Sequence, residues 1–345
     1  MSDNTDIDIN NCIEKSQQNP IESLEKNLSI DVIIPVYKPD IKFKHLIERL
    51  TKQSVKPKHI RLLHTLENYG EQQEKERQTT KDMFSYAKGL STSSCIIECI
   101  DIAKDEFDHG GTRNFGASLS QGDIIIFMTQ DAVPVDIELI KQLIRPFRNP
   151  QVAAAYGRQL AGEKAGVIEQ YTRMFNYPKE SHIKSKEDLP ELGVKTYFCS
   201  NVCSAYRKEV YDKLGGFVTK TIFNEDMIMA AGIINSGYSI AYAAEAKVIH
   251  SHTYSYLQQF KRNFDLAVSQ KQYREIFDAV KSEKEGLKLI NKTMKYLLKM
   301  KKGILIPDLF LQSGFKYLGY LAGKNYDIMP KWLVRKLSMN PGYWK

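Results

Sequence analysis

The sequence lacks the features that would direct it into a membrane or a secretory pathway. No run of about 18 or more apolar residues occurs in its 345 residues, so the sequence predicts no membrane-spanning helix. The N-terminus, MSDNTDIDINN, has neither the basic start nor the apolar stretch of a signal peptide. We therefore expect a cytoplasmic protein. Its apolar fraction of 42% is ordinary for a globular chain and allows a sizeable core.

Cysteine is scarce, and its spacing forms no metal or disulfide motif. The chain has five cysteines and no CxxC pair, which argues against a zinc ribbon and against a disulfide framework. Free cysteine behaves as a small apolar residue, so these side chains are interpreted as plain buried thiols.

A strong excess of one charge is absent from the centre of the chain. Residues 1–29 carry six acids against two lysines, and residues 281–345 carry fourteen Lys and Arg against four acids. Residues 30–280 therefore hold only +2 of the net charge of +8, which argues against a nucleic-acid-binding protein. The basic and aromatic tail, residues 281–345, predicts either a helical cap or a contact with an anionic membrane surface.

Strands and helices are predicted to alternate over residues 30–131. Apolar runs predict strands at 29–37, 60–66, 95–100 and 124–128, and helical spacing predicts helices at 42–52, 71–89 and 112–121. This alternation is typical of βαβ units and a parallel sheet. The later elements are less regular: a helix at 136–148, a strand at 152–156, an extended or helical segment at 198–207, a turn at 215–217, a helix at 224–236, strands at 238–243 and 247–250, and helices from 257 onward.

Asp131 is the first residue that could carry chemistry. It follows the strand predicted at 124–128, and open α/β sheets bind ligands at the carboxyl ends of their strands. Asp131 is either a helix cap or a ligand for Mg²⁺ or Mn²⁺, which prefer one or two carboxylates together with substrate phosphates.

Two further pairs have a structural and a chemical reading. Glu225 and Asp226 open a predicted helix, where acids are favourable in any case, but one of them could be a general base. His250 and His252 lie two apart and share one side of an extended segment. They are either a structural pair or ligands for the same cation or a phosphate.

Two polar motifs on predicted helices leave similar alternatives. Arg113 and Asn114 open the helix at 112–121, a natural anion site, and the preceding Gly110-Gly111 would allow a ligand to approach the backbone closely. The same glycines also fit an ordinary turn. Gln259 and Arg262 face one way on a helix, either as a solvated polar face or as a binding pair.

Taken in order, five segments resemble the inverting nucleotide-sugar glycosyltransferases of family 2. The resemblance covers about residues 30–265 and rests on DVIIPVY, GGTRNFG, MTQDA, the segment that begins GGF and ends NED, and VIHSHTYS with the following QxxR. FDHGGTRNFGA together with TQDA looks in particular like the bacterial rhamnosyltransferase subgroup, which uses dTDP-L-rhamnose. The resemblance implies an α/β GT-A fold with a central, mostly parallel sheet and a C-terminal helical region.

The resemblance also implies a division of the chain and a set of roles. Residues 1–29 would be a mobile acidic lead-in, 30–265 the catalytic domain and 266–345 a basic helical region. Asp226 would be the catalytic base with Glu225 beside it, and Asp131 would hold the cation with His250 or His252. The residues implied to contact the nucleotide sugar are Pro35, Val36, Tyr37, Gly111, Arg113, Asn114, Gln130, Gln259 and Arg262.

Two departures from the family pattern affect the expected activity. The usual DxD is Thr129-Gln130-Asp131, so only one acid remains, and the W of QxxRW is Asn263. With no membrane helices following, this favours addition of a single sugar over processive synthesis. We expect transfer from dTDP-L-rhamnose to a polyprenyl-diphosphate-linked saccharide, at the cytoplasmic face of the plasma membrane. The alternatives are a hexosyl- or N-acetylhexosaminyltransferase that uses a UDP-sugar, and a non-catalytic nucleotide- or glycan-binding protein.

Overall fold

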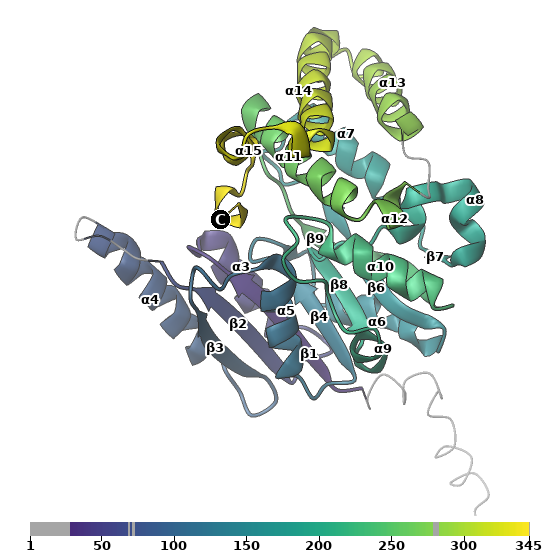
Figure 1. Ribbon diagram of the computed structural model, residues 1–345. Helices are drawn as coiled ribbons and strands as arrows, with labels where there is room; N and C mark the ends of the chain where they lie inside the picture. Colours follow the sequence, from purple (N-terminus) through teal and green to yellow (C-terminus); the bar gives the residue numbers. More distant parts are fainter. Residues whose placement is uncertain (1–27, 68–69, 71–72, 279–282, 345) are drawn as a thin grey trace, which may run out of the picture.

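The computed structural model describes residues 28–67, 70, 73–278 and 283–344, and these residues form one nine-stranded sheet with helices on both faces (Figure 1). The lead-in predicted for residues 1–29 lies almost wholly outside the described residues. The strands are β1 (Ile30–Val36), β2 (His59–Thr65), β3 (Ile96–Ile102), β4 (Ile124–Met128), β5 (Val133–Pro134), β6 (Val152–Leu160), β7 (His182–Lys184), β8 (Cys203–Arg207) and β9 (Ser239–Ile249).

Most of the sheet is parallel, as the sequence predicts. Its order is β3-β2-β1-β4-β8-β6-β9-β5, with β7 also paired to β9. Strands β1, β2, β3, β4, β6 and β9 run in one direction, and β5, β7 and β8 run against them. The antiparallel β8 lies between β4 and β6, so the sheet leaves simple βαβ alternation after Asp131.

The described helices are α3 (Ile41–Leu50), α4 (Glu74–Gly89), α5 (His109–Ser118), α6 (Leu139–Ile144), α7 (Val167–Asn176), α8 (Leu189–Leu192), α9 (Lys208–Lys213), α10 (Glu225–Asn235), α11 (Tyr256–Gln272), α12 (Arg274–Phe277), α13 (Glu283–Lys299), α14 (Ile306–Lys324) and α15 (Lys331–Leu337). Helices α3, α4 and α6 bury their apolar faces against one side of the sheet, and α5, α9 and α10 cover the other.

Strand β1 shows why this layering follows from the sequence. Val32 and Ile34 enter one core and Ile33 enters the other, and all three are fully buried. Successive side chains of a strand point to opposite faces, so a strand covered on both sides must be apolar throughout. Helix α3 follows after Asp40 caps it by accepting from the backbone N–H groups of residues 42 and 43.

Several predicted boundaries are wrong, and each has a physical reason. The helix predicted at 136–148 is α only over Leu139–Ile144 and continues as a 3-10 helix, because Pro146 has no backbone N–H to donate. The strands predicted at 238–243 and 247–250 are one strand, β9. Its pairing with β6 jumps from Ala243 to Lys247, so the intervening residues bulge out and the sequence pattern is interrupted there.

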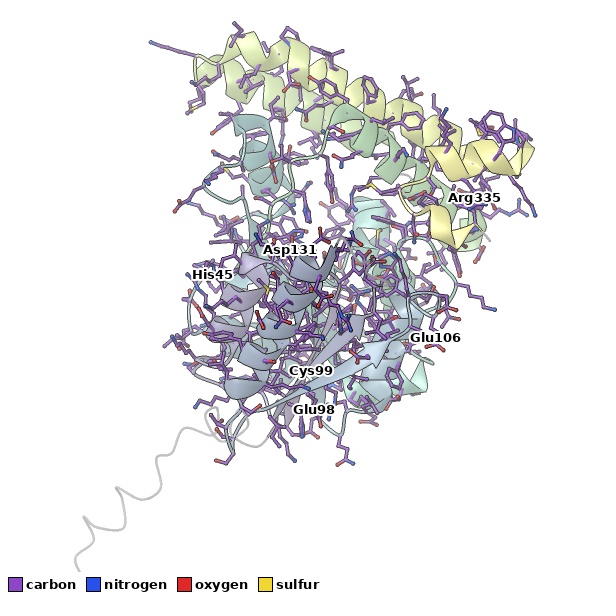
Figure 2. All side chains as sticks on the ribbon, turned by 90° about the vertical axis from the view of Figure 1, so that its left-hand side faces the viewer. His45, Glu98, Cys99, Glu106, Asp131 and Arg335 are labelled. Atoms are coloured by element: carbon purple, nitrogen blue, oxygen red, sulfur yellow. The ribbon has the colours of Figure 1, made fainter. Side chains whose placement is uncertain are left out.

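The C-terminal helices gather beyond one end of the sheet (Figure 1). Figure 2 shows Asp131 at the end of the sheet that faces them. Helix α14 packs directly on α11, where a Cβ at Gly319 would lie 2.2 Å from the carbonyl oxygen of Phe260. Within the part of the chain that is described, none of the helices has the length and apolar character needed to cross a bilayer.

Candidate active site

Asp131, His250 and His252 come together at the carboxyl edge of the sheet. Asp131 lies three residues past β4 and His250 directly follows β9, two strands that end at the same edge. The Asp131 Oδ2 atom is 3.3 Å from His252 Nε2 and 3.6 Å from His250 Nε2, and the two Nε2 atoms are 2.9 Å apart. One oxygen and two nitrogens thus converge within 4.8 Å of one another, which is the arrangement of a cation site.

Gln159 determines which nitrogen of His250 faces this cluster. Its Oε1 atom accepts from Arg173 and lies 3.1 Å from His250 Nδ1. An arginine can only donate, so the Gln159 atom beside it must be the oxygen, and His250 Nδ1 must carry the proton. The lone pair of His250 Nε2 then points at Asp131 and His252, as metal coordination by a neutral imidazole requires.

The protonation of both histidines favours the same arrangement. Burial, together with the neighbouring His252, holds the pKa of His250 well below its usual range. Burial also lowers the pKa of His252, although the Asp131 carboxylate acts in the opposite direction. Both imidazoles are therefore neutral near pH 7, so the donor set fits a divalent cation.

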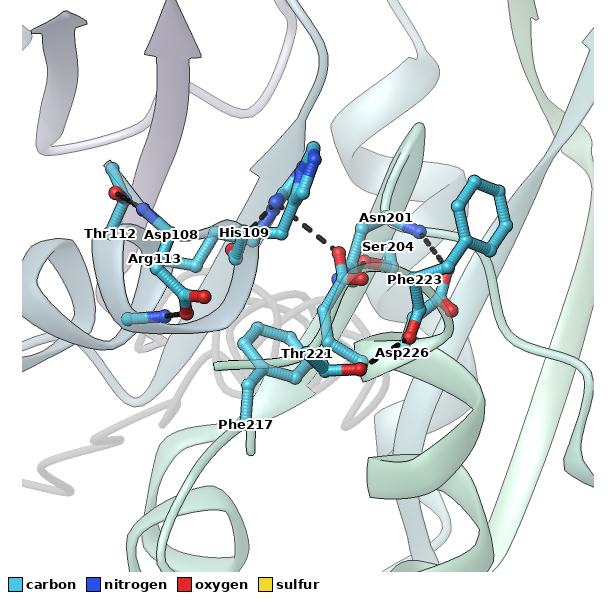
Figure 3. A network of polar contacts seen from close by, with 12 residues as sticks. Asp108, His109, Thr112, Arg113, Asn201, Ser204, Phe217, Thr221, Phe223 and Asp226 are labelled. Carbon is cyan, nitrogen blue, oxygen red and sulfur yellow. Dashed lines mark hydrogen bonds and ion pairs between the residues drawn. The ribbon is translucent and has the colours of Figure 1, made fainter. Parts of the chain in front are cut away.

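Glu225 and Asp226 begin α10 with different surroundings (Figure 3). The Asp226 Oδ2 atom accepts from the backbone N–H of Asn201 at 3.2 Å. The Glu225 Oε1 atom lies 3.3 Å from Arg113 Nη1 and 3.4 Å from Asn201 Nδ2. Figure 3 shows Arg113 on one side of the site and Asn201 and Asp226 on the other.

These surroundings separate the pKa values of the two acids. Burial raises the pKa of Asp226 to about 7, and the charge of adjacent Glu225 acts in the same direction. Burial opposes ionisation of Glu225 too, but Arg113 beside it keeps the pKa of Glu225 below its ordinary value. One acid is thus a fixed anion, and the other can exchange a proton near neutral pH, which is the property of a general base.

The loop before Asp226 is held in an unusual conformation. Asn224 has φ of 65°, in the left-handed region that asparagine adopts more readily than most residues. The carbonyl oxygen of Phe223 accepts from Thr221 at 2.8 Å and from Ser269 of α11 at 2.6 Å. These contacts fix the point at which α10 starts, and so the direction of the Asp226 side chain.

Two residues that the sequence interpretation missed connect the cation cluster with the acid pair. Gln159 Nε2 donates to Ser200 Oγ at 3.0 Å, and the next residue, Asn201, contacts both acids. Gln159 is only 2% exposed and Asn201 only 3%. The available signal was Gln159 itself, a polar residue that follows the apolar run Val152–Tyr156, because polar groups of a buried strand need partners. The sequence offers no comparable signal for Asn201.

The residues predicted to line a nucleotide pocket divide into exposed and buried ones. Val36 turns its side chain into the core, so its contribution to such a pocket is limited to its backbone. Tyr37 is exposed, and Gln130 clamps its backbone: Gln130 accepts from Tyr37 N at 2.7 Å and donates to Tyr37 O at 2.9 Å. Gln130 therefore ties the end of β1 to the end of β4. Pro35 is half-buried beside them.

The segment GGTRN differs from its predicted form. Helix α5 begins at His109, so both glycines lie in its first turn and not in a turn before it. A Cβ at Gly110 would lie 1.9 Å from the carbonyl oxygen of Val218, so the close approach that this glycine permits is to this protein's own backbone. Gly111 N donates to Asp108, which caps the helix.

Asn114 and Arg113 also make internal contacts. Asn114 donates to Phe217 O at 2.7 Å and accepts from Phe217 N at 2.9 Å, so its amide holds the turn that follows Gly216. Arg113 Nη1 donates to His109 O at 2.8 Å as well as facing Glu225. Both residues thereby stabilise the base of the site.

Gln259 and Arg262 line a cavity of about 400 Å³ that adjoins His252. The cavity lies between α7, α11 and α14. The Arg262 guanidinium lies 4.6 Å from the centre of the Phe223 ring, in the loop that precedes the acid pair. The cavity therefore connects the cation cluster with that loop.

Comparisons with known proteins identify the family of this chain. Residues 79–215 match the family model described as glycosyl transferase family 2. The chain is 36% identical over 319 residues to the O-antigen chain rhamnosyltransferase RfbN of Salmonella typhimurium, across 92% of this chain and 96% of that protein. It is 41% identical over 247 residues to the O-antigen chain rhamnosyltransferase WbaN of Salmonella anatum, across 71% of this chain and 78% of that protein.

The fold is similar to that of the mannosyltransferase PcManGT from Pyrobaculum calidifontis in complex with GDP-Man and Mn²⁺. The TM-score is 0.50 at 12% identity, over 92% of this chain and 85% of that chain. The fold is thus that of the GT-A glycosyltransferases, and the acid pair and cation cluster lie at the carboxyl edge of its sheet. Because the likeness to RfbN extends over nearly the whole sequence, the chain belongs to glycosyl transferase family 2 and is a glycosyltransferase. The predicted fold and family are confirmed.

Proposed function

We propose that this enzyme transfers a single L-rhamnose from dTDP-L-rhamnose to a hydroxyl of a lipid-linked saccharide, with inversion, in the synthesis of a cell-surface polysaccharide. The observation that carries the sugar assignment is the identity to RfbN and WbaN, both O-antigen chain rhamnosyltransferases. The FDHGGTRNFGA segment resembles the same subgroup and agrees with this assignment.

The chemistry follows from the two acids. Asp226 accepts the proton of the acceptor hydroxyl, and the resulting oxygen nucleophile attacks the anomeric carbon from the face opposite the diphosphate. Asn201 N–H fixes the orientation of the Asp226 carboxylate. Burial raises the pKa of Asp226, and the charge of Glu225, held as an anion by Arg113, acts in the same direction, so the base is strong enough to act near pH 7.

The transfer rate is expected to rise with pH through about 7 and then level off. Only the ionised form of Asp226 accepts a proton, and its pKa is raised to about 7, so the active fraction grows as pH increases through that value. The measurement is kcat between pH 5.5 and 8.5 at saturating donor, acceptor and Mn²⁺, which keeps metal loading from changing with pH. A profile that is flat over this range would contradict the assignment.

Asp131, His250 and His252 are proposed to hold a divalent cation, and Mn²⁺ suits them better than Mg²⁺. Two of the three donors are imidazole nitrogens, whereas Mg²⁺ is usually held through oxygen ligands. A cation here would neutralise the charge that builds on the departing diphosphate. The usual DxD motif would supply two carboxylates, and this site has one. The second imidazole supplies the third ligand of the cation.

The variant Gln159→Leu is expected to weaken Mn²⁺ binding by about 10- to 100-fold, the usual effect of removing the partner of a metal-bound histidine. Without the Gln159 oxygen, His250 Nδ1 has no fixed acceptor and its tautomer is no longer determined. Electron paramagnetic resonance of free Mn²⁺ during titration measures this directly. Gln159→Glu keeps an acceptor for both Arg173 and His250, so it should stay within a few-fold of the wild type. Equal Mn²⁺ affinity for the wild type and Gln159→Leu would show that the contact between Gln159 and His250 does not support cation binding.

The donor assignment is tested by thermal shift against dTDP-L-rhamnose, UDP-glucose and UDP-N-acetylglucosamine, each with and without Mn²⁺. Binding to the native state raises the midpoint by mass action, so the true donor gives the largest shift, and it should do so only with the cation. If a UDP-sugar stabilised the protein and dTDP-L-rhamnose did not, the transferred sugar would be assigned as a hexose or an N-acetylhexosamine and not as rhamnose. No stabilisation by any of the three would mean that the donor is another nucleotide sugar.

A membrane contact is proposed at the tip between α13 and α14, which we define as residues 298–304 (LKMKKGI). Three apolar side chains of this tip are exposed: Leu298 57%, Met300 50% and Ile304 88%. The lysines at 299, 301 and 302 are exposed between them. Apolar side chains ringed by lysines favour the surface of an anionic bilayer, where a lipid-linked acceptor would be found.

This contact is tested by co-sedimentation with phosphatidylglycerol vesicles and with phosphatidylcholine vesicles. The wild type should pellet with the anionic vesicles and lose most of this binding at high salt. The variant Ile304→Asp should pellet much less, whereas Ile137→Asp, the same substitution at an exposed residue of the catalytic region, should not. Binding that is independent of lipid charge would count against the proposal.

A further inference from the structure

We infer that helix α14 of the C-terminal region builds the saccharide-binding half of the active site, with Asp308, Gln312 and Lys316 facing the acceptor. These residues are four apart, so they form one stripe along α14. All three line the cavity beside His252, opposite Glu169 of α7. The inference rests on the proposed transfer function and names the place where its acceptor binds.

The stripe is held in a fixed position. Gly319 and Gly323 lie further along α14, and a Cβ on either would come within 2.3 Å of a backbone carbonyl oxygen of α11. The two helices therefore touch backbone to backbone at that end. With α14 seated in this way, its polar stripe is presented to the cavity as rigidly as the residues of α11.

A relay of hydrogen bonds leaves one buried acceptor without a partner. Asp308 accepts from Tyr256 at 2.6 Å and from Gln312 Nε2 at 2.9 Å. Gln312 Oε1 must then face Gln259, which donates to it through Nε2 at 3.4 Å and to Tyr254 O at 3.4 Å. The remaining atom, Gln259 Oε1, is buried and has no hydrogen-bond partner in the described part of the chain, although its residue lines the cavity.

Lys316 has the opposite need, since it is a donor without an acceptor among the described residues. Its ammonium group makes no ion pair or hydrogen bond with any described residue, and burial lowers the pKa of Lys316 while Glu169 across the cavity acts against that change. Lys316 therefore needs an acceptor, whereas Gln259 Oε1 needs a donor. Glu169 offers further acceptor capacity, since among the described residues only His252 N, at 3.3 Å, donates to it.

A sugar hydroxyl both donates and accepts, so a saccharide can accept from the Lys316 ammonium group and donate to the carboxylates of Glu169 and Asp308. A phosphate or diphosphate carries negative charge at neutral pH, so in this cavity it would face the carboxylates of Glu169 and Asp308. The position also fits an acceptor. The cavity reaches from His252 of the cation cluster to Arg262, which stacks on Phe223 just before the acid pair.

The inference is tested by saturation-transfer NMR with methyl glycosides of galactose, glucose, mannose and rhamnose on the full-length protein, without donor or metal. At least one glycoside should show transfer with the wild type and with Lys324→Met, which changes a lysine of α14 outside the cavity. The signal should be lost in Lys316→Met and in Gln312→Leu, with thermal midpoints showing that both are folded. Binding that persists in these two variants, or no binding of any glycoside to the wild type, would overturn the inference.

Failure of the proposed function is distinguishable from failure of this inference. The donor thermal-shift panel is measured on the wild type without any acceptor, and it alone decides whether a nucleotide sugar binds. An inorganic diphosphate control in the NMR experiment addresses the alternative occupant. Displacement of the glycoside by diphosphate that depends on Lys316 would assign the cavity to an anion and reject the saccharide.

Discussion

The variant Asp226→Asn is expected to lose transfer activity by about 10²- to 10⁴-fold, the range that a positioned general base contributes. The amide keeps the shape of the side chain and can still accept from Asn201 N–H, but it cannot take a proton from the acceptor hydroxyl. Binding of the nucleotide sugar should be retained, because Asp226 acts on the acceptor. The measurement is kcat for transfer, alongside the thermal shift given by the donor with Mn²⁺.

The matched control for this variant is Asp212→Asn, which changes an exposed acid of α9 that forms an ion pair with Lys208. It should transfer sugar at the wild-type rate. Near-normal turnover in Asp226→Asn would remove the base assignment. In that case Glu225 would be the remaining candidate, although Arg113 keeps its pKa low and makes it a weaker base.

The variant Asp131→Asn is expected to lose Mn²⁺ binding and, with it, most transfer activity. Asp131 supplies the only carboxylate of the cluster, so the change leaves two neutral imidazoles and no negative charge to hold a divalent cation. The loss of affinity should exceed the 10- to 100-fold effect expected for Gln159→Leu, because a ligand is removed and not merely its support. Titration followed by electron paramagnetic resonance gives the affinity without depending on activity.

A surface pair provides the control for Asp131. Asp101 contacts His64 at 2.9 Å, so Asp101→Asn removes the same kind of carboxylate–histidine contact where no second histidine is present. Its Mn²⁺ affinity should equal that of the wild type. If Asp131→Asn also binds Mn²⁺ normally, the cation lies elsewhere and the cluster is a structural one.

The fold was predictable where local pattern and tertiary environment agree. The helical spacing of apolar residues predicted a helix at 42–52, and α3 forms there with Phe43, Leu46, Ile47 and Leu50 buried. The bounds of β6 and β9 were harder to predict. A bulge interrupts the pairing of these two strands and breaks the period of the sequence. The division predicted at residue 265 falls inside α11 and stays a prediction.

The site was predictable as a set of residues and not as a network. Asp131, His250 and His252 were singled out by type and position, but their contact depends on a sheet order in which β4 and β9 are separated by β8 and β6. Sequence patterns within single elements carry no information on that order. Gln159 was missed because one polar residue in a buried strand says that a partner exists and does not identify it.

Gly110 and Gly111 show that a residue type can predict a close contact without identifying its partner. Sequence reasoning placed Gly110 and Gly111 in a turn that a ligand could approach, since glycine permits close contact with a backbone. The close contact exists, but it is with Val218. The residue type revealed that space is limited at this point, and only the structure identifies what fills it.

The adjacency of Ser200 and Asn201 has a consequence for how this enzyme responds to change. Ser200 receives the hydrogen bond of Gln159, and Asn201 holds both acids, so a single peptide bond joins the support of the cation to the support of the base. The two supports should therefore behave as one cooperative unit. Asn201→Ala removes the side-chain amide beside Glu225 and keeps the backbone N–H that Asp226 accepts. In a double-mutant cycle of Gln159→Leu and Asn201→Ala, the effects on kcat should be non-additive, with a coupling energy of about 0.5–3 kcal/mol. Independent effects would mean that each support relaxes without disturbing the other.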